Sequence, residues 1–164
     1  MINLKQILVA TDFGEASDAA LTYGQALARS FGATLHVLHV ADDLFTRIAG
    51  EGYASVLPEL QRDLEQAAKT RLDSLLIDND PTPLPVTKAI VTSNTPAAAI
   101  VHYAADAHVD LIVVGTQGRG GIAHLLMGSV AERVVRTAPC PVLTVRHPEH
   151  EFVRPDTPAV RGRG

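Results

Sequence analysis

Continuous apolar runs alternate with helical patterns along the chain. Such runs are typical of strands that are covered on both faces, and strands are predicted over residues 6–12, 33–40, 85–92, 110–115 and 140–146. Between them apolar residues recur at helical spacing, which predicts helices around residues 20–31, 60–75, 96–107 and 129–138. This order predicts an α/β fold: an open five-stranded parallel sheet with helices on both faces, in a Rossmann-like arrangement.

Local signals place several helix ends. Gly32 follows the first helical stretch and is a typical helix stop. Thr95 before Pro96 is predicted as an N-cap followed by proline at the first helical position. Residues 42–56 are predicted as a loop or a short helix at the rim. Residues 1–146 are therefore assigned to a single domain, and residues 147–164, with three prolines, to a mobile C-terminal tail.

Composition narrows the class of protein. The length of 164 residues suits one domain, and a hydrophobic share of 46% is enough for a core. The net charge of −4 gives no general attraction to nucleic acid or to an anionic membrane. No apolar run has the length of a membrane span, the first residues do not resemble a signal peptide, and Cys140 is the only cysteine. We expect a cytoplasmic protein that binds neither nucleic acid nor membranes.

A glycine-rich segment, GTQGRGGIAHLLMGS, follows the fourth predicted strand, and five of its fifteen residues are glycine. Ligands of open parallel sheets bind beyond the carboxyl ends of the strands. Consecutive N–H groups of such a loop can hold an anion, and so can the start of the next helix. The segment is therefore predicted to wrap a phosphate chain, with Gly115 and Gly118 allowing close approach and Gly128 and Ser129 closing the far end.

The segment also has simpler interpretations. Gly115 turns the chain in one of them, and Ser129 with Glu132 forms a capping box for the following helix. The segment is not a P-loop, because it has no Gly-Lys-Ser/Thr triplet. It is not the dinucleotide-binding fingerprint either, because that fingerprint follows the first strand.

The spacing of Gly115, Gly118 and Gly128-Ser129 resembles the ATP-binding signature of the universal stress protein family. The stretches ILVATDFGEASDAAL and MGSVAERVVRTAPCPVLTVR resemble the first and last parts of that family, so that the resemblance covers residues 3–146. Two positions depart from the family pattern. Phe13-Gly14 stands where serine or proline is frequent, and Ser93-Asn94 replaces a glycine that is common after the third strand.

The resemblance implies a site for ATP, with Mg²⁺ on its phosphate oxygens. It implies contacts with the nucleoside from Ala10, Thr11 and Asp12, and a contact with adenine from Val40. It places Gly115, Gly118 and Arg119 near the ribose and the phosphates, and Gly128, Ser129 and Val130 at the phosphates. Alternatives remain open from the residues themselves. Asp12 is also a good N-cap, Val40 suits an ordinary core, and Arg119 suits a solvated loop.

The sequence shows no hydrolytic constellation. His36 and His39 lie three apart on a predicted strand, so they face opposite sides and cannot share one metal ion. Cys140 is interpreted as buried and inert. We expect a regulatory ATP-binding protein of the stress response, with slow or no hydrolysis. The alternatives are a phosphohydrolase or nucleotidyl-transfer enzyme on the same scaffold and an interaction module that has lost nucleotide binding.

The last predicted strand is placed at an edge of the sheet. Val142, Leu143 and Val145 are too apolar for a free, solvated edge. A homodimer through the strand Val142–Val145 is expected, because a two-fold contact closes on itself, and the family resemblance points the same way. The alternative is a monomer in which the tail covers this edge.

Overall fold

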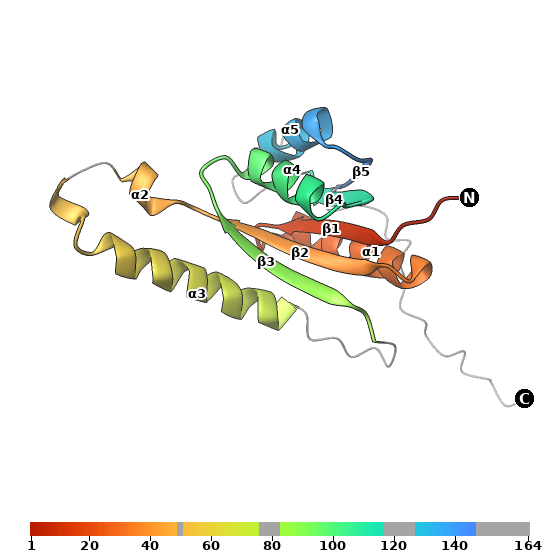
Figure 1. Cartoon of the computed structure of the whole chain (residues 1–164), viewed down its shortest axis with the longest axis horizontal. Helices are drawn as coiled ribbons and strands as arrows, with labels where there is room; N and C mark the ends of the chain where they lie inside the picture. Colours follow the sequence, from red (N-terminus) through yellow and green to blue (C-terminus); the bar gives the residue numbers. More distant parts are fainter. Residues whose placement is uncertain (49–50, 76–82, 117–126, 147–164) are drawn as a thin grey trace, which may run out of the picture.

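The protein folds around one five-stranded parallel sheet (Figure 1). The structure is a computed structural model that describes residues 1–48, 51–75, 83–116 and 127–146. The strand order is β3-β2-β1-β4-β5, and every neighbouring pair is parallel. The strands are β1 (Gln6–Thr11), β2 (Thr34–Ala41), β3 (Val86–Thr92), β4 (Leu111–Gly115) and β5 (Val142–Val145). The predicted sheet is confirmed, and β5 lies at an edge as expected.

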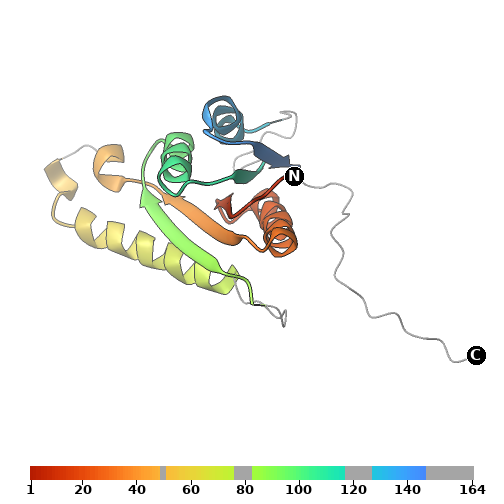
Figure 2. The ribbon, with the colours of Figure 1, turned by 45° about the vertical axis from the view of Figure 1, so that its right-hand side comes forward.

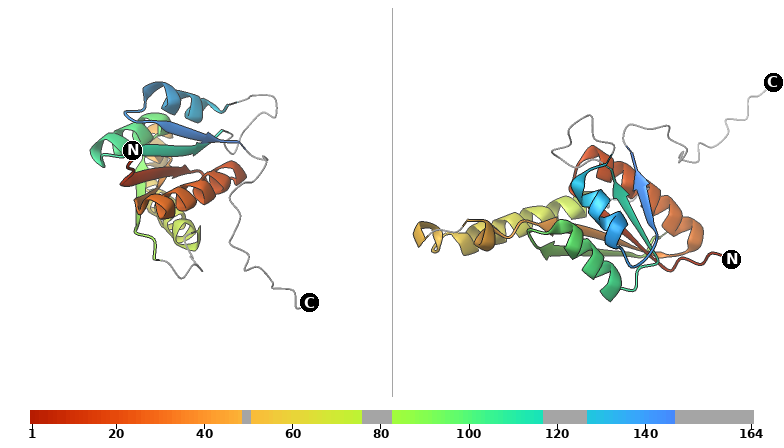
Figure 3. Two further views of the ribbon diagram at one scale, coloured as in Figure 1. Left: turned by 90° about the vertical axis from the view of Figure 1, so that its right-hand side faces the viewer. Right: turned by 90° about the horizontal axis from the view of Figure 1, so that it is seen from above.

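Helices cover both faces of the sheet (Figures 2 and 3). They are α1 (Glu15–Phe31), α2 (Leu44–Arg47), the 3₁₀ turn η1 (Glu51–Tyr53), α3 (Leu57–Leu75), α4 (Pro96–Asp106) and α5 (Ser129–Thr137). On one face Ile7 and Val9 of β1 pack with α1 and α3, and on the other Leu8 packs with α4 and α5. This alternation follows from the two-residue period of a strand, and it explains why the strands are apolar on both sides.

The predicted helix signals are confirmed in position. Gly32 ends α1 in the left-handed conformation, at φ 63°, and the N–H of Ala33 donates to the carbonyl of Ala28 at 2.8 Å. Pro96 is the first residue of α4, but the Thr95 side chain makes no capping hydrogen bond. Its hydroxyl lies 3.1 Å from that of Ser93 instead.

The apolar face predicted for α3 is only partly buried. Ala68 and Leu72 are 5% and 1% exposed, as that face requires, but Leu60 and Leu64 are 47% and 37% exposed. Figure 1 shows the reason, because α2, η1 and the first turns of α3 project past the carboxyl ends of the strands. The sheet therefore does not cover the apolar side chains of these first turns. Within residues 42–56, α2 and η1 are short helical turns, which is one of the two forms that the sequence predicts for this rim segment.

Asp110 connects the start of β1 to β4. Its Oδ2 accepts the N–H groups of Lys5 and Gln6 at 2.7 and 2.9 Å, so one carboxylate closes the amino end of the β1–β4 pair. We predict that Asp110→Ala lowers the free energy of unfolding by about 1–2 kcal/mol, because charged acceptors of backbone N–H groups are strong.

Urea denaturation of the full chain measures this loss. Asp106→Ala is the control, because Asp106 is exposed at the end of α4 and should change stability by less than about 0.5 kcal/mol. Equal midpoints for the two variants would contradict the assigned role of Asp110.

Candidate functional site

The strand order reverses beside β1. The chain passes from β1 through α1 to β2 on one side, whereas β4 pairs with β1 on the other side. The helix after β1, α1, packs on one face of the sheet, and the helix after β4, α5, packs on the other. In open parallel sheets a ligand-binding crevice is expected at the carboxyl ends of the strands where the order reverses in this way. Asp12 follows β1 at this point, and Thr116 follows β4. The two stretches singled out in the sequence thus meet at one place in the fold.

The two ends of the glycine-rich segment are joined at the end of β4. The N–H of Gly128 donates to the carbonyl of Thr116, and the N–H of Thr116 donates to that of Val145 at 2.8 Å. The start of α5 is therefore fixed above β4. Gly118 and Arg119 lie outside the described residues, and so does the tail over 147–164.

The N-terminus of α5 has no side-chain cap. Gly128 is the N-cap, with φ −71° and ψ 155°, and Ser129 is already the first helical residue. The capping box of Ser129 with Glu132 is therefore wrong, and the Glu132 carboxylate pairs with Arg136 at 2.9 Å instead. The first-turn N–H groups have no partner within the helix, so they are available to an anion. Ser129 and Val130 are both exposed.

Gly115 allows α1 to approach β4 closely. A Cβ at this position would lie 2.6 Å from the carbonyl carbon of Ala16 and 2.7 Å from its oxygen. These are backbone atoms of α1, so they cannot move aside without moving the helix. Packing therefore requires a glycine here, whether or not a phosphate also approaches it. The sequence suggested a turn or a ligand contact and gave no sign of this helix contact.

Thr116 is a buried polar residue that sequence reasoning missed. It is 6% exposed, and its hydroxyl has no hydrogen-bond partner within the described part of the chain. A buried hydroxyl without a partner costs free energy. It stands between Gly115 and the joined start of α5, where a ligand is expected.

Asp12 does not cap α1. Gly14 is the N-cap, and its N–H donates to Asp12 Oδ1 at 3.0 Å in a turn that precedes the helix. Thr11 is also used within this turn, because its hydroxyl accepts the N–H of Phe13 at 3.0 Å and lies 3.1 Å from the hydroxyl of Ser17. The interpretation of Asp12 as an N-cap is therefore wrong. Its carboxylate lies at the carboxyl edge of β1, half-buried.

Negative charge gathers on the β1 side of the crevice. Burial raises the pKa of Asp18, the Asp12 carboxylate raises it further, and Arg71 of α3 acts in the opposite direction. Glu15 adds a third carboxylate at the start of α1. The α5 N-terminus on the other side offers the positive end of a helix dipole. The crevice is thus electrostatically polar, and an anionic group is favoured on its β4–α5 side.

Small apolar side chains form a floor on one face of the sheet. Ala10 on β1 and Val40 on β2 are half-buried, and both pack against the cluster formed with α4 and α5. Met127, just before α5, packs against the same cluster and was missed from the sequence. Thr11 points to the opposite face, toward α1. Ala10, Val40 and Met127 therefore share a face that a flat ring could cover.

The described histidines and Cys140 show no arrangement typical of a second functional site. His36 contacts Tyr103 and Gln6 on one face, and His39 Nδ1 lies 2.9 Å from the carbonyl oxygen of Thr11 on the other, as predicted. Burial lowers the pKa of His36 and raises the pKa of Cys140, which favours the inert thiol. Among the described residues no group of three or more His, Cys, Asp or Glu side chains could hold a metal ion.

An open groove of about 680 Å³ lies elsewhere, between α3 and β3. Its lining is mainly charged and includes Arg62, Asp63 and Lys69, with Ile90 and Thr92 from the strand. None of its lining residues belongs to β1, β4 or α5. It is therefore separate from the crevice at the strand ends.

Known proteins share both the sequence and the fold. The sequence model of the universal stress protein family matches residues 3–146. The chain belongs to the universal stress protein family. A relative from Thermus aquaticus, named "universal stress protein in QAH/OAS sulfhydrylase 3'region", is 36% identical over 142 residues, which are 87% of this chain and 98% of the relative.

Solved structures of universal stress proteins and related chains have the same fold as this chain. MJ0577 of Methanocaldococcus jannaschii is 28% identical with a TM-score of 0.79, covering 91% of this chain and 100% of that one. A universal stress protein in complex with cAMP (23% identity, TM-score 0.57, 88% and 98% covered) shares the fold. So does one from Archaeoglobus fulgidus in complex with dAMP (19%, 0.53, 88% and 99%). No helix in the described part of this universal stress protein could cross a membrane.

The contact of Gly115 with α1 can be tested without any ligand. We predict that Gly115→Ala lowers the free energy of unfolding by about 1–3 kcal/mol, because the added methyl group would overlap the backbone of Ala16. Gly52→Ala is the matched control, since a Cβ at Gly52 would meet nothing within 4 Å. Thermal unfolding of the nucleotide-free protein decides, and equal melting temperatures would show that packing does not require Gly115.

Proposed function

We propose that this universal stress protein binds ATP across the carboxyl ends of β1 and β4 and serves as a regulatory nucleotide-binding protein. The observation that carries the proposal is the joining of Gly128 to Thr116, which sets an uncapped helix N-terminus above the strand-order reversal. The hydroxyl of Thr116, which has no hydrogen-bond partner among the described residues, supports a polar ligand at this point. Relatives of the same fold that hold cAMP and dAMP support an adenine nucleotide.

The polarity of the crevice gives the nucleotide a direction. The triphosphate lies toward Gly128, Ser129 and Val130, and the ribose hydroxyls donate to Asp12. The adenine covers the floor of Ala10 and Val40, with Thr11 contributing backbone. Gly115, Gly118 and Arg119 belong to the phosphate side. Mg²⁺ accompanies the phosphates, because their oxygens are the hard ligands that it prefers. It keeps several of its water ligands when it binds in this way.

Hydrolysis in this proposal is slow or absent. A general base must reach an attacking water beside the terminal phosphate. The described histidine near the strand ends, His39, has its Nδ1 committed to the Thr11 carbonyl, and the carboxylates lie at the opposite end of the crevice. The arrangement therefore favours a protein that senses nucleotide by holding it. No specific observation favours the phosphohydrolase.

Gly128→Val tests the phosphate end. The backbone of Gly128 is extended, so valine can adopt it, and we expect the fold to persist. The side chain would obstruct approach to the first-turn N–H groups, and the affinity for ATP should fall at least tenfold. Calorimetry measures the affinity, and the melting temperature controls for folding. Unchanged affinity in a folded Gly128→Val variant would refute this placement of the phosphates.

Asp12 tests the nucleoside end. Asp12→Ala should lower the affinity for ATP and the affinity for adenosine by a similar factor, because a ribose hydroxyl loses its hydrogen-bond acceptor. Asp12→Asn is the control for the turn, since its side-chain oxygen can still accept the N–H of Gly14. It should retain more affinity than Asp12→Ala does. If adenosine bound all three proteins equally, the ribose role of Asp12 would be wrong.

We further propose a homodimer through the edge strand β5. Hydrogen bonds of the carbonyls of Pro141 and Val145 to β4 turn the intervening backbone groups of Val142 and Thr144 outward, where a second strand can pair. Of the three apolar residues of this strand, Val145 is already covered within the protein, because it is 2% exposed and packs on α1 and the sheet. Leu143, 36% exposed, remains on the surface.

Leu143→Lys should therefore dissociate the dimer, because the added charge would be buried beside the paired strands. Leu60→Lys on α3 is the control, since Leu60 is exposed far from β5. Light scattering at micromolar concentration should give a dimer for the wild type and the control and a monomer for Leu143→Lys. A monomeric wild type would refute the dimer, and an intact Leu143→Lys dimer would move the interface elsewhere.

A further inference from the structure

Phe13 adopts a backbone conformation that is unusual for its type. Its φ is 61°, in the left-handed region, and it directly follows Asp12. A bulky residue reaches this region only where its surroundings hold it there. The same residue is one of the positions at which the sequence departs from the family pattern. Favourable contacts of Phe13 elsewhere in the fold must therefore offset the strain of its backbone conformation.

Two side chains contact the ring of Phe13. The ring of His39 on β2 lies with its centroid 4.4 Å from that of Phe13, tilted by 36°. The guanidinium of Arg71 on α3 lies 4.3 Å from the Phe13 centroid, in a cation–π contact. His39 is in turn held by its contact with the carbonyl of Thr11 at 2.9 Å. The stack thus connects β2 and α3 to the residue after Asp12.

The backbone conformation of Phe13 sets the turn that holds Asp12. The N–H of Phe13 donates to Thr11 Oγ1 at 3.0 Å, and the next N–H, of Gly14, donates to Asp12 Oδ1 at 3.0 Å. Only the second bond depends on the φ of Phe13, because the N–H of Phe13 lies before that dihedral angle in the chain. If Phe13 relaxed to a negative φ, the N–H of Gly14 would turn away and the carboxylate of Asp12 would lose its orientation.

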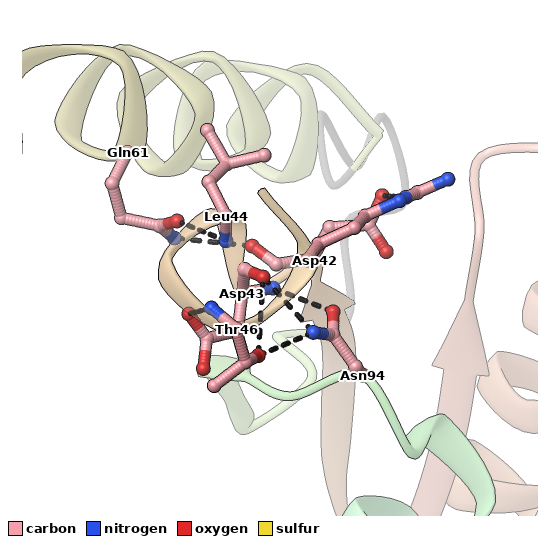
Figure 4. A network of polar contacts seen from close by, with 7 residues as sticks. Asp42, Asp43, Leu44, Thr46, Gln61 and Asn94 are labelled. Atoms are coloured by element: carbon pink, nitrogen blue, oxygen red, sulfur yellow. Dashed lines mark hydrogen bonds and ion pairs between the residues drawn. The ribbon is translucent and has the colours of Figure 1, made fainter. Parts of the chain in front are cut away.

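Helix α3 is held firmly enough to place Arg71. Gln61 is 7% exposed and ties α3 to the segment before α2, as Figure 4 shows. Its Oε1 accepts the N–H of Leu44 at 3.0 Å, and its Nε2 donates to the Asp42 carbonyl at 3.2 Å. Further along, Asp73 pairs with Lys88 of β3 at 2.6 Å. Arg71 lies between these two anchors.

We propose that Arg71 and Phe13 are positioning residues of the nucleoside end of the site: the cation over the ring holds Phe13 in its left-handed conformation and thereby orients the carboxylate of Asp12. This inference rests on the proposed function, because it assigns to Asp12 the ribose hydroxyls. It gives α3, which has no other part in the site, an influence on nucleoside affinity. The phosphate end, on α5, is independent of this stack.

The test compares adenosine with inorganic tripolyphosphate on the full chain. Arg71→Ala should weaken the binding of adenosine about two- to fivefold, the range that an exposed cation–π contact supplies. It should leave tripolyphosphate unchanged. Arg62→Ala is the matched control, since Arg62 is an exposed arginine of the same helix that does not contact Phe13. It should change neither affinity, which separates positioning from the loss of a positive charge on α3.

Glycine at position 13 provides a rescue. Phe13→Gly adopts a positive φ without strain, so it should keep adenosine affinity within about twofold, whereas Phe13→Ala should lose it. In the Phe13→Gly background Arg71→Ala should have no further effect. Melting temperatures of all variants control for folding.

Each other outcome overturns part of the account. Equal adenosine affinities of Arg71→Ala and Arg62→Ala, or equal losses from Arg71→Ala in both backgrounds, overturn the positioning role alone. A loss in Phe13→Gly as large as that in Phe13→Ala overturns it too, because the ring would then act by some means other than the backbone. A wild type that binds neither probe overturns the proposed function, and the positioning role with it.

Discussion

The close packing of α1 against β1 and β4 is the constraint on which the candidate site depends. Without a side chain at Gly115, the first turn of α1 lies directly on β4. That contact fixes where the turn after β1 leaves the sheet, and so where Asp12 stands. On the other side of the sheet, the start of α5 is attached to the end of β4 by the hydrogen bond from the N–H of Gly128 to the carbonyl of Thr116. The contact of α1 with β4 therefore sets the position of the β1 side of the crevice relative to its β4–α5 side.

The halves differ in charge, and this difference gives the site its chemistry. Carboxylates cluster where α1 begins, and they would repel phosphates at short range. The start of α5 has neither a side-chain cap nor a carboxylate that folds back over its first N–H groups. A ligand with a neutral hydroxylated end and an anionic end matches this pattern. Nucleotides have that form, and the half-buried floor of Ala10 and Val40 suits the flat base.

The sequence predicted the sheet well because buried parallel strands are continuous apolar runs, and their order is fixed by the helices between them. Helix faces were harder to predict. The sequence pattern of α3 includes Leu60 and Leu64, but nothing local says that the sheet ends before it reaches them. Caps failed for a related reason. Asp12 and Ser129 are good N-cap types, yet the N-cap residues are Gly14 and Gly128, because tertiary contacts set where each helix starts.

The parts of the site that escaped prediction are all non-local. Thr116 was not recognised because its burial depends on β5 and α5, and Met127 because it reads as one apolar residue among many. The stack of Arg71, Phe13 and His39 joins three elements far apart in the sequence. Equilibrium dialysis of Mg·ATP against the full chain tests the central claim most directly, with adenosine and tripolyphosphate as separate competitors. The account predicts saturable binding of ATP that each competitor displaces alone, whereas binding that neither displaces, or no saturable binding, would contradict it.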